Sequence, residues 1–68
     1  MNLLKEDATL VLNAAIETSG LKKTWIADRT GINYNYLVSV LKGDRRLTTE
    51  NAMKIAKVIG LDYQKILK

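Results

Sequence analysis

Apolar residues recur along this 68-residue chain at the three- and four-residue intervals of amphipathic helices, and a glycine follows each of the first four stretches. The first predicted helix ends before Gly20, and its apolar stripe consists of Leu4, Ala8, Val11, Leu12 and Ala15. A shorter helix over residues 23–30 ends at Gly31, and its core positions are Ile26, Ala27 and Thr30. No alternating run indicates a strand, so the pattern predicts an all-α chain without a sheet.

Three further helices are predicted, each with a plausible capping residue at its start. Asn33 caps a helix over residues 34–42, whose inward positions are Leu37, Val40 and Leu41. Thr48 caps a helix that ends before Gly60 and has the stripe Ala52, Ile55, Ala56 and Ile59. Asp62 caps a short last helix with the apolar positions Tyr63, Ile66 and Leu67. We therefore expect one compact five-helix domain over residues 1–68.

Length and composition exclude several function classes. The chain has no cysteine and no histidine, which excludes disulfides, zinc fingers and nucleophile pairs that depend on those residues. We therefore expect no enzyme activity and no cofactor or metal. No apolar run approaches the roughly 18 residues of a membrane span, and Glu6 and Asp7 interrupt any signal-peptide core. These features predict a soluble, intracellular protein that is not associated with a membrane.

The formal net charge of +4 is unevenly distributed. Residues 21–46 carry six basic and two acidic side chains, whereas the rest of the chain carries five of each. All of the excess positive charge therefore lies in one central segment. Such a segment favours a nucleic-acid partner, and the alternative is a basic surface that is merely solvated.

The same segment has the spacing of a helix-turn-helix over about residues 21–43. Gly31 provides the positive φ of a tight turn, and Ala27 is small enough for the second helix to cross closely. The outward side of the second helix then carries Tyr34, Asn35, Val38, Ser39 and Lys42. Asparagine pairs with adenine, serine donates or accepts, and valine packs on a thymine methyl, so this face suits the major groove.

The stretch LKKTWIADRTGINYNYLVSVLKG, residues 21–43, resembles the helix-turn-helix of the lambdoid repressor and Cro superfamily. Residues 48–62 are similar to the family's fourth helix and the start of its fifth. The resemblance implies base-reading roles for Tyr34, Asn35 and Ser39, with Val38 adjacent. It implies phosphate contacts for Lys22, Lys23, Lys42, Arg45 and Arg46. The hydroxyl of Tyr36 is a further candidate for a phosphate contact, and the alternative for that ring is packing on its own helix.

Two positions depart from the family pattern. The family usually has serine or threonine where Lys22 stands and glutamine where Lys23 stands, so point charges replace a hydrogen-bonding clamp on the DNA backbone. Tyrosine is also unusual at the base-reading position occupied by Tyr34.

Two apolar features do not belong to DNA binding. Trp25 is predicted to face outward between Lys22 and Arg29, whose stems and cation–π attraction would cover the ring; the alternative is a protein contact. A second apolar line along the first helix could receive a protein partner and is bordered by Glu6, Asp7 and Glu17; it consists of Leu3, Leu10 and Ala14.

The prediction is a sequence-specific transcriptional regulator, a Cro-like repressor of a bacteriophage or bacterial switch that reads an operator in double-stranded DNA with the helix over residues 34–42. The resemblance implies a homodimer joined through residues 61–67. It also implies a cytoplasmic protein of a bacterial host cell that is associated with the nucleoid. The alternative is a modulator or antirepressor that forms a heterocomplex with a larger phage repressor. A third class, antitoxins of similar fold, usually carries an added toxin-binding extension.

Overall fold

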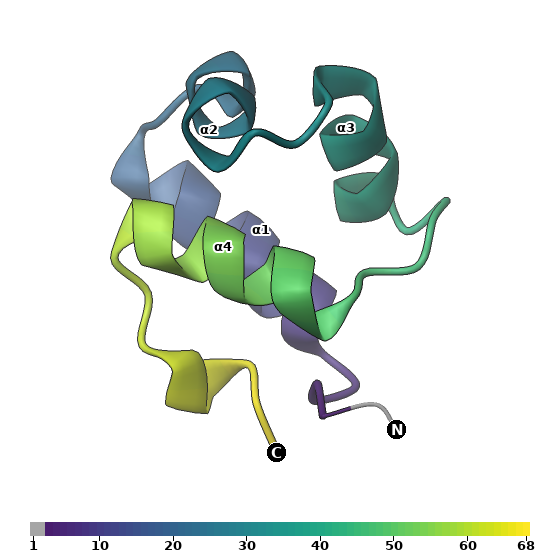
Figure 1. Ribbon diagram of the computed structural model, residues 1–68. Helices are drawn as coiled ribbons and strands as arrows, with labels where there is room; N and C mark the ends of the chain where they lie inside the picture. The colour runs from purple at the N-terminus through teal and green to yellow at the C-terminus, as the bar shows by residue number, and fades with distance from the viewer. Residues whose placement is uncertain (1–2) are drawn as a thin grey trace.

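The computed structural model describes residues 3–68, which form four α-helices and one turn of 3₁₀ helix (Figure 1). The elements are α1 (Ala8–Ser19), α2 (Lys23–Thr30), α3 (Tyr34–Lys42), α4 (Thr49–Ile59) and η1 (Tyr63–Lys65). In Figure 1, α2 and α3 lie at the top, α4 crosses in front of α1, and η1 lies at the bottom, near the C-terminus. No helix in the described part of the chain has the length and apolar character needed to cross a membrane.

Local signals place the helix ends where the sequence predicts them. Each α-helix is followed by a glycine with positive φ. Asn33 accepts hydrogen bonds from the backbone N–H groups of Asn35 and Tyr36, and Thr48 accepts one from Asn51. The predicted starts of α3 and α4 are therefore confirmed, with the capping oxygen satisfying N–H groups that the helix itself leaves unpaired.

The core joins all four helices to both ends of the chain. Ile26, Leu37 and Ile55 are fully buried between α2, α3 and α4, as the apolar stripes predict. The stripe of the first helix needs two corrections. Leu4 is buried but lies before α1, which starts at Ala8. Ile16 is buried and Ala15 only half-buried, because the core side of α1 follows the four-residue spacing of Ala8, Leu12 and Ile16.

The five-helix count is wrong, because the last predicted helix is a single 3₁₀ turn. Asp62 caps it as predicted, through a 3.0 Å hydrogen bond from the Gln64 N–H. Beyond the turn the chain pairs with the N-terminal segment in one antiparallel bridge between Leu4 and Leu67. The Lys5 N–H donates to the Ile66 carbonyl, and the Lys68 N–H donates to the Leu3 carbonyl, both at 2.8 Å. This pairing places Ile66, which is 0% exposed, in the core. The backbone groups that pair with the N-terminal segment are not available to continue a helix beyond the 3₁₀ turn.

Candidate nucleic-acid interface

The turn between α2 and α3 is held from both sides. Gly31 has φ 76° and donates its N–H to the Ala27 carbonyl at 2.9 Å, which ends α2. The Thr30 hydroxyl donates to the Ile26 carbonyl at 2.8 Å and accepts from the Ile32 N–H at 3.3 Å. These bonds connect the last turn of α2 to the first residue after the glycine, so they orient α3 relative to α2. The predicted helix-turn-helix is confirmed in its helices and its turn.

The exposed face of α3 carries the side chains predicted to read bases. Tyr34 is 45% exposed, Asn35 is exposed, and Val38 and Ser39 are half-buried. Asn33 Oδ1 satisfies the Asn35 backbone N–H at 2.9 Å. The Asn35 side-chain amide itself has no hydrogen-bond partner among residues 3–68, so both its donor and its acceptor are available to a ligand.

The loop after α3 folds back onto that helix and brings a cation beside its polar face. The backbone N–H groups of Asp44 and Arg45 both donate to the Ser39 carbonyl, at 2.9 and 3.4 Å. A surface depression of about 320 Å³ results, and it is lined by Asn33, Asn35, Tyr36, Ser39 and Arg45. The structure thus brings together two predicted base-reading side chains, Asn35 and Ser39, and two predicted phosphate contacts, Tyr36 and Arg45.

Tyr36 has a structural role that the sequence did not reveal. Its half-buried ring packs against the core, and its hydroxyl lies 3.4 Å from the Arg46 carbonyl in a long hydrogen bond. This bond uses the hydroxyl proton and steadies the loop that carries Arg45 and Arg46. The phosphate contact of Tyr36 remains a prediction. Because the hydroxyl proton is donated to the Arg46 carbonyl, the hydroxyl oxygen would reach a phosphate through a bridging water that donates to both.

The other predicted phosphate contacts are exposed cations: Lys22, Lys23, Lys42, Arg45 and Arg46. Within the described residues none of them forms an ion pair. Lys22 precedes α2 and, as its poor capping propensity predicts, makes no side-chain cap. The first N–H groups of α2 therefore add the positive end of a helix dipole to two lysine charges.

One side chain on α1 positions the far end of α3. Asn13 Nδ2 donates to the Leu41 carbonyl at 2.8 Å and to the Thr9 carbonyl at 3.1 Å. Helix periodicity gives Asn13 no functional role. The one sequence signal is its position in the interior of a helix, where asparagine is disfavoured unless its side chain has a hydrogen-bond partner.

The apolar features that were not assigned to DNA binding are exposed. Trp25 is 38% exposed, and the Arg29 guanidinium carbon lies 5.1 Å from the ring centroid, which confirms the predicted cation–π contact with Arg29. Leu10 is 72% exposed and Ala14 is exposed. Leu3 is also exposed but lies before α1, in the segment paired with the C-terminus, so the predicted apolar line does not continue through Leu3 along a helix face.

Comparison with known families agrees with this geometry. A helix-turn-helix family model of the Cro/C1 type matches residues 12–66, which include most of α1, all of α2 to α4 and the 3₁₀ turn. No curated protein and no solved structure matches the chain. Because the matched range covers most of the sequence and the described fold contains the turn and both of its helices, the chain belongs to the Cro/C1-type helix-turn-helix family of DNA-binding regulators.

Proposed function

We propose that this protein is a Cro-like repressor that recognises a specific operator by placing α3 in the major groove. The observation that carries the proposal is the depression on α3 where Asn35 and Ser39 lie beside Arg45. An uncommitted asparagine amide suits the N6 and N7 edge of adenine, and serine either donates to or accepts from a base. Tyr34 and Val38 extend the same face with an aromatic hydroxyl and a group able to contact a thymine methyl.

Phosphate contacts would hold this face in register. Lys22 and Lys23 lie at the start of α2, where the helix dipole adds to their charge. Lys42 is the last residue of α3, and Arg45 and Arg46 lie in the loop that follows it. The two groups of cations thus lie before α3 and at its C-terminal end along the chain. Such an arrangement supports contact with the backbone on both sides of a groove.

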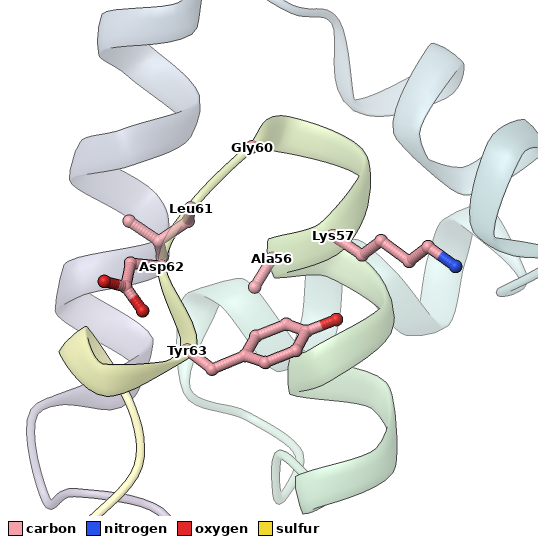
Figure 2. A pocket seen from close by; sticks show the side chains of 6 residues that line it. All are labelled: Ala56, Lys57, Gly60, Leu61, Asp62 and Tyr63. Atoms are coloured by element: carbon pink, nitrogen blue, oxygen red, sulfur yellow. The ribbon is translucent and has the colours of Figure 1, made fainter.

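Operator binding by this family architecture would use two copies, with recognition helices about 34 Å apart on successive major grooves. We propose residues 61–67 as the dimer surface. Ile66 is committed to the core, which leaves the half-buried Leu61, Tyr63 and Leu67 for a partner. Figure 2 shows the Tyr63 ring lying along α4 near Ala56, at a depression of about 410 Å³ that Leu61 also lines.

The experiment is a selection of bound sequences from random double-stranded DNA, run with the wild-type protein, Asn35→Ala and Thr18→Ala. We expect the wild type to enrich one pseudo-palindrome. Asn35→Ala is expected to lose about 1–3 kcal/mol on that site and relax the preference at one base pair in each half. Thr18→Ala removes a polar side chain from an exposed position of α1, outside the helix-turn-helix and outside residues 61–67, and leaves the profile unchanged.

A second candidate function is a modulator that pairs with a larger repressor, and the exposure of Leu10 and Trp25 favours it. The same selection, repeated with that repressor present, separates the two functions. A modulator enriches no sequence alone and changes the sequence that the repressor enriches.

A further inference from the structure

A basic groove lies between α2 and α4, outside the proposed DNA-contacting residues. Its volume is about 370 Å³, and it is lined by Arg29, Thr30, Lys54, Lys57 and Val58. Trp25 lies beside the groove, since Arg29 lies over its ring. Three cations and a half-buried valine therefore line the groove, and a partly exposed indole ring borders it.

Most of the positive charge in this groove is not neutralised by the protein itself. Lys54 pairs with Glu50 at 3.6 Å, the one ion pair among the described residues. Arg29 stacks on Trp25, which leaves its N–H groups free to bind a carboxylate. Figure 2 shows the Lys57 side chain directed away from the Asp62 carboxylate, although both residues line the neighbouring depression. Arg29 and Lys57 thus present unpaired charge.

The opposite combination occurs on the outer face of α1. Leu10, Ala14 and Glu17 follow the i, i+4, i+7 spacing of one helix face, away from the buried Ala8, Leu12 and Ile16. Asp7 precedes the helix, and α1 contains no lysine or arginine. This face therefore presents a solvent-exposed leucine with carboxylates on either side of it.

We propose that copies of this protein associate head to tail, with the outer face of α1 in one copy docked in the groove between α2 and α4 of the next. Leu10 would pack against Trp25 and Val58, and Glu17 and Asp7 would meet Arg29 and Lys57. Charge complementarity identifies the occupant as a second copy, because the same chain supplies both the acidic helix with its apolar centre and the basic groove.

This contact joins two different surfaces and is therefore heterologous, so it extends from copy to copy instead of closing as a dimer. None of its residues belongs to the proposed base-reading or phosphate-contacting set, or to residues 61–67. The association therefore does not depend on the proposed sequence specificity.

Charge reversal tests the proposal. Sedimentation velocity over a range of concentrations is measured for the wild type, Glu17→Arg, Arg29→Glu and the variant with both changes. We expect each single reversal to weaken head-to-tail association at least tenfold and the double variant to recover most of it. Thr24→Glu adds an acid five positions from Arg29, about 140° around α2, and leaves association unchanged.

Trp25 provides a second readout because it is the chain's one tryptophan. Its emission is expected to shift to shorter wavelength as the wild type associates. Leu10→Asn is expected to abolish the shift, and because Leu10 is exposed, this substitution should not unfold the protein. Circular dichroism verifies that all variants are folded, and binding to a single operator measures the proposed function separately. Equal association by the wild type, the two single reversals and the double variant would overturn the proposal, whatever the outcome on DNA. So would a wild-type protein that forms nothing larger than a dimer.

Discussion

Asn13 on α1 donates its side-chain amide to the Leu41 carbonyl at 2.8 Å, in the last turn of α3. Among residues 3–68 this is the one side-chain hydrogen bond that connects two different α-helices. The carbonyls of a helix's last turn lack partners within the helix, so Asn13 satisfies a group that would otherwise be exposed or unpaired. The helix α3 is thereby fixed to the scaffold at the end away from its exposed N-terminus.

Asn13→Ala is expected to lower the free energy of unfolding by about 1–2 kcal/mol, because a half-buried carbonyl loses its donor. Urea denaturation measures the change. Thr18→Ala, at an exposed position of the same helix, serves as the control and is expected to shift the midpoint little. Equal destabilisation by the two variants would show that the Asn13–Leu41 bond contributes nothing specific.

Gly31→Ala is expected to destabilise the protein by about 1 kcal/mol through backbone strain alone. The residue has φ 76°, and an added Cβ would meet no atom within 4 Å, so steric overlap with the rest of the fold is absent. Asparagine adopts this conformation more readily than alanine. Thermal unfolding of Gly31→Asn should therefore show a smaller loss, and the reverse order of the two variants would contradict this account of the turn.

Arg45→Ala is expected to weaken binding to the operator and to random DNA by the same factor, since a phosphate contact carries no sequence information. Fluorescence anisotropy with labelled DNA at several salt concentrations measures both affinities. The slope of log affinity against log salt should decrease in magnitude by about 1 for each phosphate that the bound variant no longer neutralises. An effect restricted to the operator would instead assign Arg45 to base reading.

Ile66→Ala is expected to cost about 2–5 kcal/mol, because the side chain is fully buried and its removal leaves a cavity. Ile66→Val should cost about 0.5–1.5 kcal/mol, and Lys65→Ala, at the exposed neighbouring position, should have little effect. Thermal unfolding ranks the three variants. If Ile66→Ala were as stable as Lys65→Ala, the last residues would not be part of the core.

Local signals explain which parts of this fold could be predicted. Asn33, Thr48 and Gly31 act on the backbone within a few residues, so the limits of α2, α3 and α4 follow from the sequence. The spacing of Leu37 and Val40 likewise identifies the exposed face of α3, because both are buried and the remaining positions turn outward.

The failures concern partners that are distant along the chain. The last predicted helix is replaced by a 3₁₀ turn and a bridge because Ile66 and Lys68 pair with Lys5 and Leu3. The same pairing removes Leu3 from the predicted line on α1. The bond from Asn13 to Leu41 and that from Tyr36 to Arg46 also depend on tertiary packing, which helix periodicity does not specify.

The bridge between Leu4 and Leu67 also has a consequence for the order of folding. Closing a contact between segments more than 60 residues apart costs more chain entropy than the local turns do, so α2 and α3 can form their corner before the bridge exists. During synthesis the segment around Leu4 is made long before Ile66. Completion of the core therefore waits until residues 66–68 have been added, and a nascent chain that stops short of them cannot form the bridge.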